Sequence, residues 1–188
     1  LKILLTEKGG QIPAVYQQRM AEALKNKDLA KAEKVFEAWG AAKAYIKEMG
    51  LDEARYQQTA DGMMAGLDEY RFELEWSAAK SAIPPGLAIE KDFLQAEKVA
   101  EKWVEMESKD WKGGVAEDRR KRMEEVRGSL QKLFAAYMAK LQKDADMIYR
   151  SGGGALSIQR DMDFLREKTP NLVRLFKKEF NQMENMLL

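Results

Sequence analysis

Apolar residues recur along most of this chain at the three- and four-residue spacing of an amphipathic helix. The clearest run covers residues 53–80, where spacings of four and three alternate over Tyr56, Ala60, Met63, Leu67, Tyr70 and Leu74. This alternation is typical of a coiled-coil seam. Phe72 and Trp76 lie off the seam, one turn apart, and predict a second apolar face on the same helix.

The same spacing predicts further helices over about 13–26, 28–49, 87–108, 116–149, 156–168 and 170–187. Residues 1–11 are expected to form a lead-in arm, and Pro13 suits the first turn of the helix that follows. Asp28 and Asp52 are expected N-caps. Gly50 predicts a left-handed C-cap, with an apolar contact from Leu51, so that two helices meet in a tight hairpin.

One octet of the sequence occurs twice. The segment 32–39, AEKVFEAW, returns 64 residues later as AEKVAEKW at 96–103, with six of eight positions identical, including Trp39 and Trp103. We interpret this as two related helical hairpins, at about 28–80 and 92–145. Chance recurrence in a chain rich in Ala, Glu and Lys is the alternative.

These patterns predict an all-α protein, an elongated antiparallel bundle of six to seven helices that includes the possible duplication. No period-two alternation argues for a strand. Residues 1–150 are expected to form the bundle. Residues 151–188 are expected to begin with a glycine linker and to continue as helices that pack on the bundle or extend from it.

The amino-acid composition lacks two residue types on which many catalytic sites depend. The 188 residues include no cysteine and no histidine, the usual thiolate nucleophile, general base and zinc ligands. The pairs Asp144/Asp146 and Asp161/Asp163 suggest calcium, but neither is followed by the glycine and glutamate of an EF-hand loop. We therefore predict a protein that is not an enzyme, with no catalytic residue, no cofactor and no metal site.

Charge and hydropathy restrict the kinds of molecule that this protein is expected to bind. Lysine plus arginine number 32 and aspartate plus glutamate 31, and the basic run 119–122 is flanked by acidic residues, so specific nucleic-acid binding is not expected. No apolar run approaches the roughly 20 residues of a membrane span, which predicts a soluble chain and leaves peripheral membrane contact open. A start at Leu1 and the absence of cysteine favour an imported or secreted protein over a cytosolic one.

Two short segments resemble known families. Residues 27–37 are similar to one helix of tetratricopeptide and pentatricopeptide repeats, but those families recur near 34 or 35 residues and this chain does not. Trp103 and Glu107 have the Trp-x-x-x-Glu spacing of bacterial effectors that act as guanine-nucleotide exchange factors. That resemblance implies a secreted effector acting on a host GTPase; an ordinary core tryptophan followed by a solvated glutamate is the alternative.

The function expected from these observations is a non-catalytic scaffold, adaptor or accessory subunit that binds other protein subunits. Aromatic and methionine side chains are enriched at interface cores. The candidate interaction residues are Phe72, Trp76, Leu172, Phe176, Phe180 and Met183. A helical bundle that binds a lipid or pigment in a cavity lined by Trp39, Trp76 and Trp103 is a further alternative, beside the effector.

Overall fold

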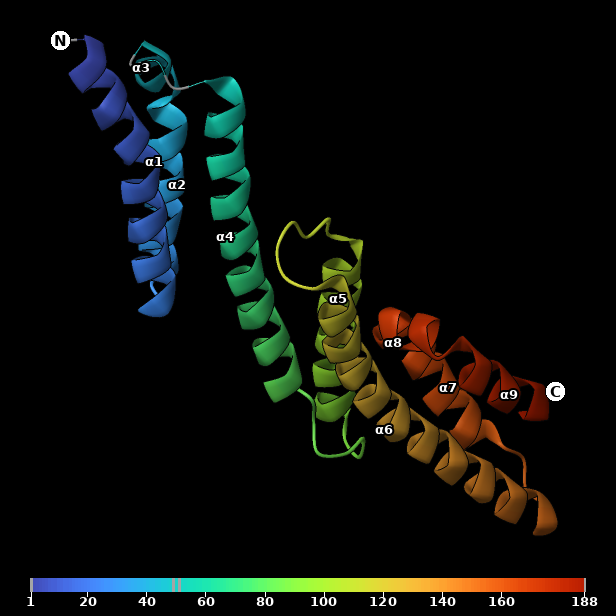
Figure 1. The fold of residues 1–188 in the computed structure, drawn as a ribbon. Coiled ribbons are helices and arrows are strands. Elements are labelled where there is room, and N and C mark those ends of the chain that lie inside the picture. Colours follow the sequence, from blue (N-terminus) through green and yellow to red (C-terminus); the bar gives the residue numbers. More distant parts are fainter. Residues whose placement is uncertain (1, 49, 51, 188) are drawn as a thin grey trace. The chain divides into compact units, whose positions relative to one another are not determined.

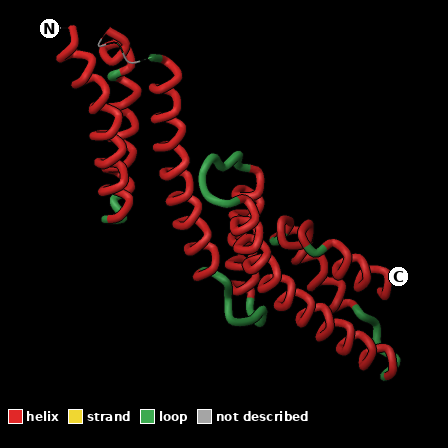
Figure 2. The backbone as a smooth tube through the Cα atoms, in the orientation of Figure 1, coloured by secondary structure: helices red, strands yellow, loops and turns green. Residues whose placement is uncertain are grey.

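A computed structural model describes residues 2–48, 50 and 52–187, with side chains from residue 11 onward. Every regular element in these described residues is a helix, which confirms the all-α class (Figures 1 and 2). The helices are α1 (Lys2–Lys25), α2 (Leu29–Ala41), α3 (Lys43–Glu48), α4 (Glu53–Ser81), α5 (Glu90–Ser108), α6 (Ala116–Arg150), α7 (Leu156–Lys168), α8 (Pro170–Leu175) and α9 (Lys177–Leu187). None of them is long and apolar enough to cross a bilayer.

Local capping explains where two of these helices begin. The Asp28 carboxylate accepts a hydrogen bond from the backbone N–H of Lys31 at 2.9 Å, and Asp52 accepts one from Arg55 at 2.6 Å. Both predicted N-caps are confirmed. Gly50 has a φ of +84°, the left-handed conformation that favours glycine, and so ends α3 as predicted. The expected contact of Leu51 lies outside the described residues.

Three predicted boundaries are wrong. Residues 2–11 are helical rather than an arm, and Pro13 lies inside α1. Glycine and proline lower helix propensity by about 1 and 3 kcal/mol, which is a penalty and not an absolute stop. The segment 28–49 divides into α2 and α3 at Ala42, and the segment 170–187 divides into α8 and α9 at Phe176. Phe176 leaves the helical backbone and buries its ring 5.6 Å from that of Phe134, so tertiary packing stabilises that break.

The chain forms two compact units. Unit 1 contains residues up to 75 together with 110–118, and unit 2 contains residues 76–109 and 119–188. The apolar faces of α7, α8 and α9 share one core with α5 and α6 within unit 2.

Unit 1 is built around Trp39, whose side chain is fully buried. Tyr56 stacks on it with 4.9 Å between ring centroids and 9° between planes, and Tyr16 packs against it at 5.2 Å. The rest of this core comprises Met20, Ala23, Ala32, Ile46, Met63 and Leu67. Most of the predicted seam of α4 therefore faces the core, but Leu74 is 42% exposed and does not.

Residues 110–118 return to unit 1 through specific contacts with α4. The ring of Trp111 lies edge-on to Phe72 at 5.3 Å, and the backbone N–H of Lys112 donates to the Asp68 carboxylate at 3.1 Å. A Cβ atom on Gly113 would clash with the backbone carbonyl of Ala65. Only glycine allows this close approach of two backbones.

Unit 2 contains the larger core. Trp103 is 7% exposed, and its indole N–H donates to the backbone carbonyl of Met123 at 2.8 Å, which ties α5 to α6. Phe93 packs edge-on against Tyr137 of α6 and Phe164 of α7. The most deeply buried side chains on the other helices include Leu130, Phe134, Met162, Leu165, Leu172 and Phe176.

The repeated octets have closely similar burial patterns. In each, the alanine at the first position and the tryptophan at the last are buried, while the lysine at the third and the glutamate at the sixth are exposed. Both octets thus present the same helical face to a core. Trp39 and Trp103 are both buried. The duplication of whole hairpins stays a prediction.

Candidate functional site

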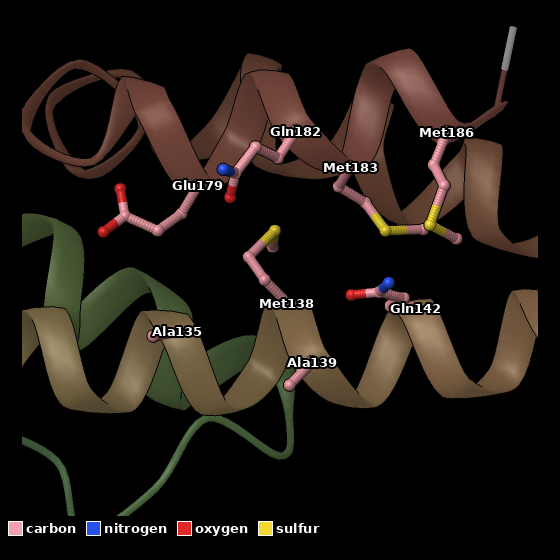
Figure 3. Close-up of a pocket in the computed structure, with 8 residues that line it drawn as sticks. All are labelled: Ala135, Met138, Ala139, Gln142, Glu179, Gln182, Met183 and Met186. Atoms are coloured by element: carbon pink, nitrogen blue, oxygen red, sulfur yellow. The ribbon is translucent and has the colours of Figure 1, made fainter.

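A groove of about 430 Å³ lies between α6 and α9 in unit 2 (Figure 3). We call it the methionine groove. It is lined by Ala135, Met138, Ala139 and Gln142 of α6 and by Glu179, Gln182, Met183 and Met186 of α9. Sequence analysis identified Met183 alone among these residues.

Helical periodicity positions the whole lining. On each helix the four residues have the spacing i, i+3, i+4, i+7, which places them on one face. Ala135 and Ala139 have short side chains, so space remains beside α6. Met138 and Met183 are 6% and 3% exposed and form the floor, and Met186 is half-buried beside them (Figure 3). The sequence alone does not single out the four α6 residues, because their role depends on the helix that faces them.

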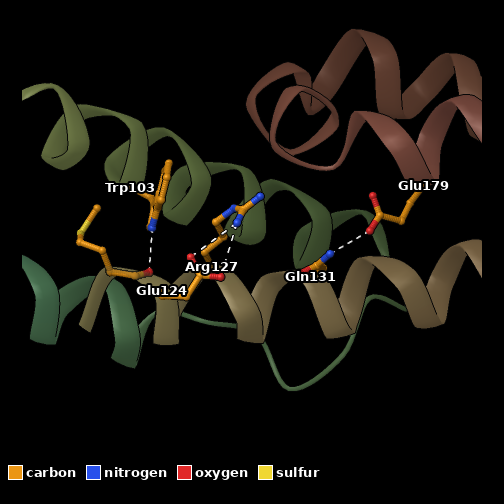
Figure 4. Close-up of polar contacts among 6 residues, drawn as sticks. Trp103, Glu124, Arg127, Gln131 and Glu179 are labelled. Atoms are coloured by element: carbon orange, nitrogen blue, oxygen red, sulfur yellow. Dashed lines mark hydrogen bonds and ion pairs between the residues drawn. The ribbon is translucent and has the colours of Figure 1, made fainter. Parts of the chain in front are cut away.

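Polar side chains close one end of the groove. The Gln131 side-chain amide donates to the Glu179 carboxylate at 2.9 Å and links α6 to α9 (Figure 4). Farther along α6, Arg127 pairs with Glu124 at 3.4 Å. Gln142 and Gln182 are exposed at the rim. The groove therefore combines an apolar, flexible floor with two glutamines and one carboxylate at its edge.

The predicted interaction face of the last helix is packed rather than presented. Leu172, Phe176, Phe180 and Met183 are each at most 3% exposed, because all four belong to the core of unit 2. The binding of another protein by these residues stays a prediction. Met183 alone of the four also lines the groove.

The predicted face of Phe72 and Trp76 is also not an exposed surface. Phe72 is 3% exposed against Trp111 in unit 1. Trp76 belongs to unit 2, where it is half-buried and its indole N–H donates to the carbonyl of Arg122 at 3.1 Å. The charged groups of Lys80 and Arg122 lie 4.9 and 5.0 Å from its ring centroid. Cation–π contacts thus occupy the exposed side of this tryptophan.

The tryptophans behave as core residues. Trp39 belongs to the core of unit 1, whereas Trp76 and Trp103 belong to that of unit 2. Neither unit by itself therefore contains all three tryptophans of the predicted cavity. Glu107, four residues after Trp103, is exposed. This pair has the arrangement of a core tryptophan followed by a solvated glutamate.

The structure brings together two aspartates that the sequence did not associate. The sequence suggested Asp144 with Asp146 and Asp161 with Asp163 as pairs of carboxylates. Asp144 of α6 and Asp161 of α7 line one groove. Burial, with the nearby Asp144 charge, raises the pKa of Asp161, which Lys140 partly offsets. Burial also raises the pKa of Tyr137 to about 12, with smaller contributions from Asp161 and Asp144. Within the described residues no group of three or more acidic side chains has a geometry that could hold a metal ion.

Comparison with known proteins adds no relative. No protein-family profile, no curated protein sequence and no solved structure matches this chain. The function is therefore argued from the chemistry and placement of its own residues.

Proposed function

We propose that this protein is a non-catalytic helical scaffold, adaptor or accessory subunit that binds another protein through the methionine groove. The observation that carries the proposal is the lining itself, in which three methionines from two helices meet at a surface with glutamines along its rim. Methionine is flexible and polarisable, and it adapts to apolar side chains of a partner. The absence of cysteine and histidine supports a role without thiolate, histidine-base or ordinary zinc chemistry.

The volume of the groove also falls in the range of small-ligand pockets, about 300–1,000 Å³. A lipid- or pigment-binding role therefore stays a second candidate, now on the methionine groove rather than on a tryptophan cavity. The two candidates differ in what remains bound after purification. Native mass spectrometry separates them, because an added mass of a small molecule supports a ligand and an added polypeptide supports a partner.

The groove offers a matched pair of variants on α6. Ala139 is exposed and lines the groove, whereas Ala136 is exposed and does not. Ala139→Lys places a long charged side chain in the groove, and Ala136→Lys adds the same charge elsewhere on the helix. A partner protein that co-purifies with the wild-type chain from the source organism is the reference. We expect this partner to be lost with Ala139→Lys and retained with Ala136→Lys, as measured by quantitative co-purification.

Equal retention by both variants, with unchanged melting temperatures, would contradict binding through this groove. A wild-type chain that carries only a small molecule would favour the ligand-binding candidate. Stimulation of nucleotide exchange on a GTPase that is lost in a Glu107→Ala variant would favour the effector alternative.

A further inference from the structure

A second groove, of about 450 Å³, lies between α6 and α7 next to the turn that joins them. We call it the acidic groove. Asp144, Met147, Ile148 and Ser151 contribute from α6 and the turn, and Ser157, Ile158 and Asp161 contribute from α7. It shares no residue with the methionine groove, so inferences about the two grooves stand or fall separately.

Apolar side chains are unusually exposed around this turn. Met147 is 54% exposed and lines the groove, and Tyr149 and Leu156 nearby in the sequence are 46% and 65% exposed. Ile148 and Ile158 add apolar surface deeper in the groove. Met147, Ile148 and Ile158 therefore give the groove an apolar part beside its two carboxylates.

The acidic charge of the groove is only partly compensated, through the nearby charge of Lys140. Asp144 and Asp161 approach from facing helices. Burial raises the pKa of Asp161 most, Lys140 lowers it in part, and the charge of Asp144 adds a smaller rise. Among the described residues neither carboxylate has a side-chain hydrogen bond or an ion pair. A cation held between them would relieve the repulsion that the folded chain retains.

We propose that the acidic groove docks a segment of another protein in which a lysine or arginine stands beside an apolar side chain. The cationic head would lie between Asp144 and Asp161, and its aliphatic stem and the apolar neighbour would cover Met147 and Ile148. Long basic side chains bury their stems in this way while the charge keeps polar contacts. This surface is additional to the proposed function of the methionine groove.

The negative charge of the groove disfavours an apolar segment and a second copy of this chain as occupants. A purely apolar segment would bury two carboxylates without partners, which is strongly unfavourable. A second copy docked by two-fold symmetry would bring two copies of this acidic patch together, because an isologous interface uses the same surface on both subunits. A basic segment meets neither penalty.

The test uses the full chain and two short synthetic helical peptides that share one leucine face, the first with lysines and the second with glutamates on the flanks. Binding is followed by two-dimensional NMR of the labelled protein. We expect the lysine peptide to shift the signals of Asp144, Met147, Ile148, Ser157, Ile158 and Asp161, and the glutamate peptide to leave them unchanged.

The matched control uses the neighbouring aspartates. Asp144→Asn with Asp161→Asn removes the groove charges, and Asp146→Asn with Asp163→Asn removes the same net charge from the exposed sides of the same helices. The first pair should weaken binding of the lysine peptide about tenfold or more, and the second should leave it within about twofold. Circular dichroism and melting temperature confirm that each variant is folded.

Equal weakening by both pairs would overturn the proposal, because it would indicate general charge attraction. Equal binding of the two peptides, or shifts confined to residues outside the groove, would also overturn it. Shifts of the groove signals with calcium alone, together with no response to the lysine peptide, would assign the groove to a cation instead. Concentration-dependent dimerisation lost in the Asp144→Asn, Asp161→Asn variant would assign it to a second copy.

Discussion

The Glu97 carboxylate accepts hydrogen bonds from Asn171 through both the backbone N–H, at 3.0 Å, and the side-chain amide, at 2.8 Å. Its second oxygen accepts from the backbone N–H of Leu172 at 2.9 Å. A side chain of α5 therefore satisfies the first N–H groups of α8, a helix too short to be stable alone. This contact holds the segment that continues into α9 and the methionine groove.

Glu97→Gln should loosen that attachment. The substitution replaces one accepting oxygen with an NH₂ group and removes the charge, and hydrogen bonds to charged groups contribute about 1.5–3 kcal/mol. We expect a loss of stability of this order in urea unfolding and faster hydrogen exchange at residues 171–175. Glu101→Gln, an exposed change on the same helix, is the control. Unchanged exchange in Glu97→Gln would show that packing alone holds α8.

Trp103→Ala should destabilise the protein by about 3–5 kcal/mol, the range for truncation of a buried aromatic residue. The ring is 7% exposed, and the variant also loses the hydrogen bond to Met123. Glu107→Ala, at an exposed position, should change stability by about 0.5 kcal/mol or less. Urea unfolding followed by fluorescence and circular dichroism measures both. A melting curve of Trp103→Ala that overlays the wild type would refute its core role.

Asp161 should give a pH dependence of stability with a defined sign. Its folded pKa is raised, chiefly by burial, so the folded state binds the proton more tightly than the unfolded state. The stability that this group contributes is complete below its ordinary unfolded pKa, about 3.9, and is lost as the pH rises through the folded value. Asp161→Asn should therefore raise the melting temperature at pH 7, and the gain should vanish near pH 4. A gain that persists at low pH would argue against the titration of Asp161 as its cause.

Tyr137 should ionise only in strong alkali, since burial, aided by the carboxylates of Asp161 and Asp144, raises its pKa to about 12. Ultraviolet titration should show a final tyrosinate step near that pH, which Tyr137→Phe removes. Asp161→Asn should shift the same step to lower pH because it removes one of the two negative charges. A final step that survives in Tyr137→Phe would assign it to another residue.

The repeated octets show how far local sequence can predict long-range contacts. Glu33 and Glu97 occupy the same octet position, yet Glu33 pairs with Arg71 at 2.7 Å and Glu97 binds the start of α8. The two tryptophans differ in the same way. The Trp103 indole N–H has an acceptor on α6, whereas that of Trp39 has none among the described residues.

The buried face of α6 was predicted only approximately. The spacing of Leu130, Leu133 and Tyr137 placed them on one stripe, but Leu133 and Tyr137 are half-buried and the neighbouring Phe134 is fully buried. A helix in contact with several partners buries more than one stripe, and the sequence does not state how many partners it has. For the same reason the sequence predicted neither the methionine groove nor the common groove of Asp144 and Asp161.

The sequence by itself determined the helical class, the N-caps at Asp28 and Asp52 and the turn at Gly50, since these depend on side chains within a few residues of each backbone group. It also excluded cysteine and histidine chemistry. Tertiary structure decided the two units, the break at Phe176, the burial of the predicted interaction residues and both grooves. Those features depend on which amphipathic faces meet, a choice among many similar apolar stripes that only the packed chain resolves.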